Sequence, residues 1–328
     1  MSSDAAAAAL SDVLPAGFVL TGGIPLKHPD FAASIVFVIA YLLLIPAALF
    51  RIIRPTSRTT VLVRPAIFLV ARVGTYVVRA IQANGNYSTG LFIAEQILML
   101  CGFQLLCAPL VSLVKYQTYQ GWIPTGQKGS QPFELITRLL DVALTVAIIL
   151  GIVVGSEISD AKNNVDTANA LRDCRWANGI ISTIVVAISI LLVFFMHTRQ
   201  SMPLRSTLYV VAIGALLLVP CVYKLVIYAH PPSPISTGSK VAFYFFFALP
   251  EWLVDLAYFG INLQETFDIA EGTRKEKWEK AARKGKVQGE YMSESESDGE
   301  GRSYQMKRTG GYPVGNGVRS SRAEGGKV

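Results

Sequence analysis

Four ionisable side chains lie inside two long apolar segments, at spacings that place each pair on one side of a helix. Arg72 and Arg79 are seven residues apart, close to two turns of an α-helix. Glu251 and Asp255 are four residues apart, so they also share a face. Because a charge in apolar surroundings is costly unless it is paired, we expect the two segments to meet through an ion-pair cluster.

A third apolar segment adds Glu95, Gln96 and Gln104 to this set. We expect Glu95 at the depth of Arg79, with the two amides further along the same helix. One interpretation is a gated polar site on the path of a substrate or a proton. The other is a structural ion pair that fixes how the three segments pack. Buried ionisable groups mark functional sites, but packing alone can satisfy them, so both interpretations stay open.

These side chains belong to a chain with seven long apolar segments. The length of each segment is close to the roughly 20 residues that a helix needs to cross a bilayer. Hydrophobic residues make up 52% of the chain and charged residues 16%, against about 25% charged in soluble domains. The sequence therefore predicts an all-α integral membrane protein, a seven-transmembrane helix bundle. Its predicted spans are Phe31–Phe50, Val61–Ile81, Leu91–Val114, Leu135–Gly155, Asn178–His197, Thr207–Tyr228 and Val241–Leu263.

Basic residues concentrate in alternate loops, which is the usual mark of the cytoplasmic side. The loop between the second and third spans carries no charge, and acidic residues outnumber basic ones between the fourth and fifth. This pattern predicts an outside N-terminus and a cytoplasmic C-terminus. It also explains the net charge of +7 without a nucleic-acid partner. The basic loop residues are Arg51, Arg54, Arg58, Lys115, Lys128, His197, Arg199 and Arg205.

Four regions follow from this topology. Residues 1–30 are expected to be an extracellular N-terminal segment, and residues 31–263 the seven-transmembrane domain. Residues 264–290 form a basic juxtamembrane segment, which either lies on anionic lipid or only fixes the topology. Residues 291–328 combine serine, acidic and glycine residues, so we expect a disordered cytoplasmic tail.

Two kinds of modification are possible on this topology. Asn86 begins an Asn-Tyr-Ser sequon in a predicted outer loop, which makes it a candidate for glycosylation. In the tail, Ser293, Ser295 and Ser297 alternate with acidic residues and are candidates for phosphorylation. Added phosphate would deepen the acidic block and weaken the hold of the basic segment on lipid.

Several catalytic chemistries have no residues to support them in this sequence. The three histidines lie outside the span interiors, so a histidine-bound catalytic zinc is not expected. There is no Gly-x-Ser-x-Gly nucleophile motif. We therefore expect no metal, no cofactor and no enzymatic activity.

Two stretches resemble a known family. They are the run Ala71–Arg79, with Leu91–Leu98 and Ala108-Pro109 after it, and Phe247-Ala248-Leu249-Pro250 near the last span. The chain resembles the fungal RTA-like seven-span proteins, also called lipid-translocating exporter-like. Residues Ala248–Val254 also resemble the last span of a related fungal seven-span family without an assigned function. The first resemblance implies movement of lipids or amphiphilic toxins across the plasma membrane, or resistance to them.

Other functions fit the same topology. A seven-transmembrane receptor that signals inward is one alternative, and a membrane scaffold that transports nothing is another. The partners expected from the sequence are membrane lipids and a lipid or amphiphile substrate. The plasma membrane is the favoured location over an internal membrane, and the sequence leaves the oligomeric state open.

Overall fold

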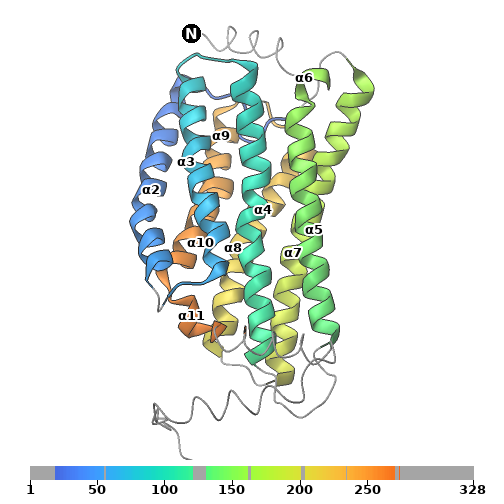
Figure 1. The fold of residues 1–328 in the computed structure, drawn as a ribbon. Coiled ribbons are helices and arrows are strands. Elements are labelled where there is room, and N and C mark those ends of the chain that lie inside the picture. The colour runs from blue at the N-terminus through green and yellow to red at the C-terminus, as the bar shows by residue number, and fades with distance from the viewer. Residues whose placement is uncertain are drawn as a thin grey trace, which may run out of the picture. The chain divides into compact units, whose positions relative to one another are not determined.

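A computed structural model describes residues 19–54, 57–120, 131–161, 164–200, 204–233, 235–269 and 273. Every regular element in this part of the chain is a helix (Figure 1). Several predictions fall outside the described residues: the N-terminal segment up to residue 18, Lys128, the basic segment from residue 274 to 290, and the tail of 291–328 with Ser293, Ser295 and Ser297.

Seven helices among the described residues are long and apolar enough to cross a membrane, which confirms the predicted seven-span bundle. The chain is a multi-pass integral membrane protein. Short helices α6 (Ile158–Ala161) and α11 (Leu263–Thr266) lie outside the spans. The spans are α2 (Lys27–Ile53), α3 (Val63–Ala83) after the 3₁₀ turn η1 (Thr60–Leu62), α4 (Thr89–Gln120), α5 (Gln131–Ser156), α7 (Val165–Gln200), α8 (Leu204–Ala229), and a seventh made of α9 (Thr237–Phe243), η2 (Tyr244–Ala248) and α10 (Leu249–Gly260).

Consecutive helices run in opposite directions, so the α3–α4 connection and α6 lie at one end of the bundle and α11 at the other (Figure 1). We call the first the outer end, after the orientation that the charges predict. At the inner end, Arg51 donates from Nε to the carbonyl of Phe259 at 3.0 Å and from Nη2 to that of Gly260 at 3.1 Å. These bonds satisfy carbonyls that α10 leaves free at its C-terminus and tie α2 to the seventh span.

Helix α4 is the central element of the bundle. Within its most apolar stretch 72% of the residues are buried, against 22% for α2. Leu106, Cys107 and Leu110 of α4 are fully buried, whereas apolar side chains such as Leu43 and Val70 point outward with 72% and 66% of their surface exposed. Outward apolar residues are what a membrane requires, because lipid is their solvent.

The fifth span differs most from its prediction. It was expected from Asn178 to His197, with residues 156–177 as an outer loop, but α7 already begins at Val165. Its first turns are too polar to be recognised as a span. Asn164 explains the start, because its Oδ1 accepts hydrogen bonds from the backbone N–H of Asp166 at 3.0 Å and of Thr167 at 3.4 Å.

The seventh span is broken by a π-helical turn at Tyr244–Ala248. Pro250 has no N–H and cannot donate to the carbonyl of Phe246, so one hydrogen bond of a regular α-helix is missing at this point. Instead, the N–H of Leu249 donates five residues back, to Tyr244. The wide turn directs neighbouring rings to opposite sides: Phe246 is 46% exposed, while Phe247 is fully buried.

Close packing of α4 against α5 depends on Gly155. A Cβ at this position would lie 2.0 Å from Cγ1 of Ile97, whereas at Gly74 the nearest atom would be Leu98 Cδ1 at 3.7 Å. We expect Gly155→Ala to destabilise the protein by about 1–3 kcal/mol, because overpacking forces the helices apart. Gly74→Ala is the matched control and should leave the melting temperature in detergent unchanged or slightly raised. Equal melting temperatures for the two variants would contradict this packing.

The predicted orientation can be tested with the native cysteines. All four are free; Cys174 lies on the outer part of α7 and is partly exposed, while Cys107 and Cys221 are buried. An impermeant maleimide added to intact cells should therefore label the protein, and Cys174→Ser should abolish the label. If the label appears only in permeabilised cells, Cys174 faces the cytoplasm and the predicted orientation is wrong.

Candidate functional site

Eight Asp, Glu, Lys and Arg side chains of the described residues are at most 2% exposed, and they form two groups. The outer network contains Arg79 with its partners near the outer end. The central cluster contains Arg72 and its neighbours deeper in the bundle. Basic and acidic residues are equal in number. The eight are Asp30, Arg72, Arg79, Glu95, Lys224, Lys240, Glu251 and Asp255.

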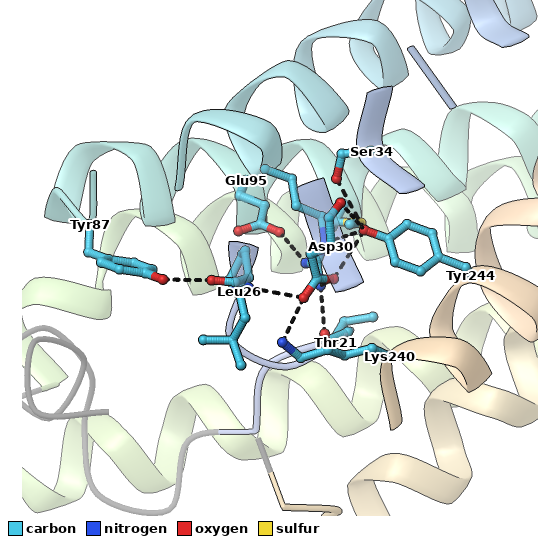
Figure 2. A network of polar contacts seen from close by, with 12 residues as sticks. Thr21, Leu26, Asp30, Ser34, Tyr87, Glu95, Lys240 and Tyr244 are labelled. Carbon is cyan, nitrogen blue, oxygen red and sulfur yellow. Dashed lines mark hydrogen bonds and ion pairs between the residues drawn. The ribbon is translucent and has the colours of Figure 1, made fainter. Parts of the chain in front are cut away.

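Arg79 is the hub of the outer network, and its partners Asp30, Glu95 and Tyr244 are labelled in Figure 2. Its Nη1 donates to Glu95 at 2.8 Å, and its Nη2 donates to Asp30 at 3.0 Å. The Nε donates to the hydroxyl of Tyr244 at 3.1 Å, and the guanidinium carbon lies 4.7 Å from the ring centre of Phe243. The arginine therefore joins α2, α4 and the seventh span, and the predicted proximity of Arg79 and Glu95 is confirmed.

Asp30 completes this network from α2 (Figure 2). One carboxylate oxygen lies 2.6 Å from Nζ of Lys240 and accepts from the backbone N–H of Leu26 at 3.0 Å. The other accepts from Arg79 and, at 3.1 Å, from the Tyr244 hydroxyl. Each of the four charged groups here is thus within ion-pair distance of an opposite charge.

Asp30, Lys240 and Tyr244 were not among the predicted site residues. The first helix was expected to begin at Phe31, so Asp30 was assigned to the N-terminal segment, but α2 begins at Lys27. Lys240 lay just before the predicted seventh span. Charge balance is the signal that could have found them. At this depth the two basic side chains of Arg79 and Lys240 face only one predicted carboxylate, that of Glu95, so a second carboxylate was to be expected.

Residues 19–26 lie against the outer network and are held mainly through their backbone. Arg79 Nη2 donates to the carbonyl of Gly22 at 2.6 Å, and the Tyr87 hydroxyl donates to that of Pro25 at 2.7 Å. Arg175 of α7 donates to the carbonyl of Val19. Burial, with a smaller effect from the negative charge of Asp30, raises the pKa of Tyr87, which keeps the phenol protonated as a donor.

Gly22 is required where it stands. Its φ of +85° is in the left-handed region, and a Cβ would lie 2.9 Å from the ring of Phe243. The neighbouring Leu20, Thr21 and Ile24 are at most 7% exposed. The segment is therefore a packed part of the outer end.

The central cluster is built on an ion pair between Arg72 and Glu251. Arg72 Nη2 donates to Oε1 of Glu251 at 2.5 Å, and both side chains are fully buried. Nη1 donates weakly to the carbonyl of Leu98 at 3.4 Å, while the guanidinium lies over the rings of Phe68 at 4.9 Å and Phe247 at 5.4 Å. The ion pair expected between the second and seventh spans is present.

Two further charged groups of the central cluster have no ionic partner among the described residues. Asp255 is fully buried, and neither carboxylate oxygen has a hydrogen-bond partner there; the same is true of Oε2 of Glu251. Lys224 is 1% exposed, and its Nζ finds no acceptor in the same part of the chain. Instead the ammonium lies over the rings of Phe103, 3.9 Å from the centroid, and Phe247, at 5.3 Å.

The two predicted amides lie apart from the ion pairs. Gln104 Nε2 donates to Ser182 at 2.6 Å and to Asn178 at 3.2 Å, both on α7. Gln96 is fully buried, and neither of its side-chain atoms has a hydrogen-bond partner among the described residues. Gln104 therefore links α4 to α7.

Asn86 of the sequon lies in the α3–α4 connection, at the outer end, and its side chain is exposed. This position is consistent with the requirements of a glycosylation acceptor. Whether it carries a glycan stays a prediction.

No group of three or more His, Cys, Asp or Glu side chains in the described part of the chain could hold a metal ion.

A groove opens on the membrane-facing surface beside the central cluster. It has a volume of about 440 Å³ and is lined by side chains of α8 and the π-helical turn: Leu218, Val219, Val222, Tyr223, Val226 and Phe246. The Tyr223 ring lies 6.2 Å from the ring of Phe247, whose surroundings include Lys224 and Arg72. Tyr223 therefore both lines the groove and lies next to a ring that packs against the buried basic side chains.

The outer network should contribute strongly to stability. Arg79→Met removes the partner of two buried carboxylates, so we expect a loss of about 3–5 kcal/mol, seen as reduced melting temperature in detergent. Arg64→Met is the matched control, because its ion pair with Asp141 is about half exposed and should contribute less than about 1 kcal/mol. Similar melting temperatures for both variants would show that the network is dispensable.

Comparison with known proteins identifies a family but no activity. No curated protein and no solved structure matches the chain. Residues 31–266 of the 328 match the sequence model of a family described as "Domain of unknown function (DUF7702)". The match runs from the first turns of α2 to the end of α11 and so takes in all seven spans and most of both charged groups. The chain belongs to the DUF7702 family.

Proposed function

We propose that the protein translocates lipids or other amphiphiles across the membrane, with the polar group of the substrate held in the central cluster. The observation that carries this proposal is that the buried polar atoms of Asp255 and Lys224 have no hydrogen-bond partner among the described residues. A buried charge without a partner is costly, and inside a membrane it marks a ligand or ion path by default.

The outer network gives the internal comparison that favours a binding site over a structural one. There, two basic and two acidic side chains all lie within ion-pair distance of an opposite charge. In the central cluster, Arg72 and Glu251 form the only ion pair among residues that the structure describes. If the second group were also purely structural, Asp255 would add cost without a compensating contact, and Lys224 would be compensated only by the rings of Phe103 and Phe247.

The groove supplies a place for the hydrocarbon part of the substrate. Its volume of about 440 Å³ is within the usual range of roughly 300–1,000 Å³ for ligand pockets. A polar group could pass from there to the charges by displacing Tyr223 and Phe247. Phe247 sits on a π-helical turn, and such turns are frequent at functional sites.

The proposal agrees with the resemblance to lipid-translocating proteins, and we place the activity in the plasma membrane on that ground. Movement to the outer side would require the outer network and residues 19–26 to open, because they close the bundle at that end.

The test is a flip assay with fluorescent phospholipid and sphingoid-base analogues in liposomes that contain the purified protein. We expect protein-dependent movement of at least one analogue. In Asp255→Asn, which removes the carboxylate with little change of shape, the rate of this movement should fall by a factor of about ten or more. Asp141→Asn is the matched control, since Asp141 lies in an exposed ion pair away from the cluster. Its rate should equal that of the wild type.

Both variants must elute as the wild type does in gel filtration for the rates to be compared. No protein-dependent movement of any analogue would contradict translocation and favour the receptor or scaffold alternatives. Equal rates of movement in Asp255→Asn and the wild type would show that the substrate does not pass through the central cluster.

A further inference from the structure

We propose that the polar group recognised by the central cluster is zwitterionic, with its anionic part at Lys224 and its cationic part at Asp255 and Glu251. This inference rests on the proposed function for the site, and it names the chemistry of the substrate. It follows from which donors and acceptors in the cluster remain free, and from where they lie along the seventh span.

Lys224 provides the anion side. Its ammonium has three N–H donors, and none meets an acceptor among the described residues. The faces of Phe103 and Phe247 attract the charge, at 3.9 and 5.3 Å, but they replace hydrogen bonds only in part. A phosphate or carboxylate oxygen that entered between these rings would take up the free donors.

Asp255 and Glu251 provide the cation side. Three carboxylate oxygens are free there: both of Asp255 and Oε2 of Glu251. Arg72 occupies only the remaining oxygen, Oε1 of Glu251. This side of the cluster therefore offers acceptors and negative charge to a cation.

The two sides are close along the helix axis. Phe247, which Lys224 overlies, is followed by Glu251 and Asp255 at intervals of four residues. With a rise of about 1.5 Å per residue, each interval corresponds to roughly 6 Å. One small head group with opposite charges a few bonds apart is therefore of the right size to reach both sides.

Charge balance favours a zwitterion over simpler ligands. Arg72 and Lys224 oppose Glu251 and Asp255, so the cluster has as many basic as acidic side chains. An amphiphile with a single charge would compensate one free group, leave the other without a partner and add a net charge to the core. A zwitterion compensates both and adds none.

Binding of three single-chain amphiphiles with the same chain length provides the test. The probes are a lysophosphatidylcholine, an alkyl phosphate and an alkyltrimethylammonium salt, measured by calorimetry with the purified protein in an uncharged maltoside detergent. We expect the wild type to bind the zwitterion about tenfold more tightly than either singly charged probe, because each side adds a charge-assisted contact.

Two variants should change this order in opposite directions. Lys224→Gln should lose the preference and bind the cationic probe best, whereas Asp255→Asn should bind the anionic probe best. Lys224→Arg keeps the charge and should keep the preference for the zwitterion. If a variant fails gel filtration, the order of the three probes on the wild type decides alone.

The inference is overturned if the wild type binds either singly charged probe as tightly as the zwitterion, if it binds none of the three, or if folded Lys224→Gln and Asp255→Asn keep the original order. Calorimetry detects binding without movement, so a failure of this inference can be distinguished from a failure of the proposed translocation. A zwitterion preference without flipping in liposomes would refute translocation alone, and flipping without the preference would refute this inference alone.

Discussion

Two arginines on one face of α3 organise much of the bundle, because nothing in the hydrocarbon interior can solvate them. Arg79 takes its partners from α2, α4, the seventh span and residues 19–26, and Arg72 takes its partners from the seventh span and α4. Each partner is in turn fixed by the need to face a guanidinium. The relative placement of these helices therefore follows from two residues on one of them.

The two arginines nevertheless have different surroundings. Around Arg79 the charges are matched, and all three guanidinium nitrogens donate to acceptors. Around Arg72 the geometry is looser: one good ion pair, two long contacts with Leu98 and Met99, and aromatic rings. A π-helical turn and a proline lie next to this looser region. The part of the bundle best suited to rearrange is thus the part with uncompensated charge.

Much of this arrangement could be predicted from the sequence, because its causes are local. Seven apolar segments and the helical spacing of Arg72, Arg79, Glu251 and Asp255 are visible without any tertiary information. Proximity of Glu95 to Arg79 follows from depth alone. The predicted ionisable residues also point to α3, α4 and the seventh span as helices that form the buried charged groups. They do not reveal what the members of the family do.

What could not be predicted depends on long-range contacts. Asp30 lies at the start of a span, where composition cannot separate a buried carboxylate from an exposed one; only Arg79 and Lys240, far along the chain, decide its burial. The polar first turns of α7 carry no apolar signal. The sequence does show Pro250 in the seventh span, but whether its effect is a kink or a π turn depends on the packing of Phe246 and Phe247.

Most of the hydrogen bonds that hold residues 19–26 end on carbonyl groups of the segment, and this has a consequence for how the chain can vary. Every residue type has a carbonyl, so the contacts of Arg175 with residue 19 and of Tyr87 with residue 25 tolerate many substitutions. They do not tolerate a change in length, since one inserted or deleted residue would move each carbonyl away from its donor. Across related chains, the residue count of this segment and the glycine at its centre should stay constant, while its less buried positions, such as residue 19, diverge in residue type.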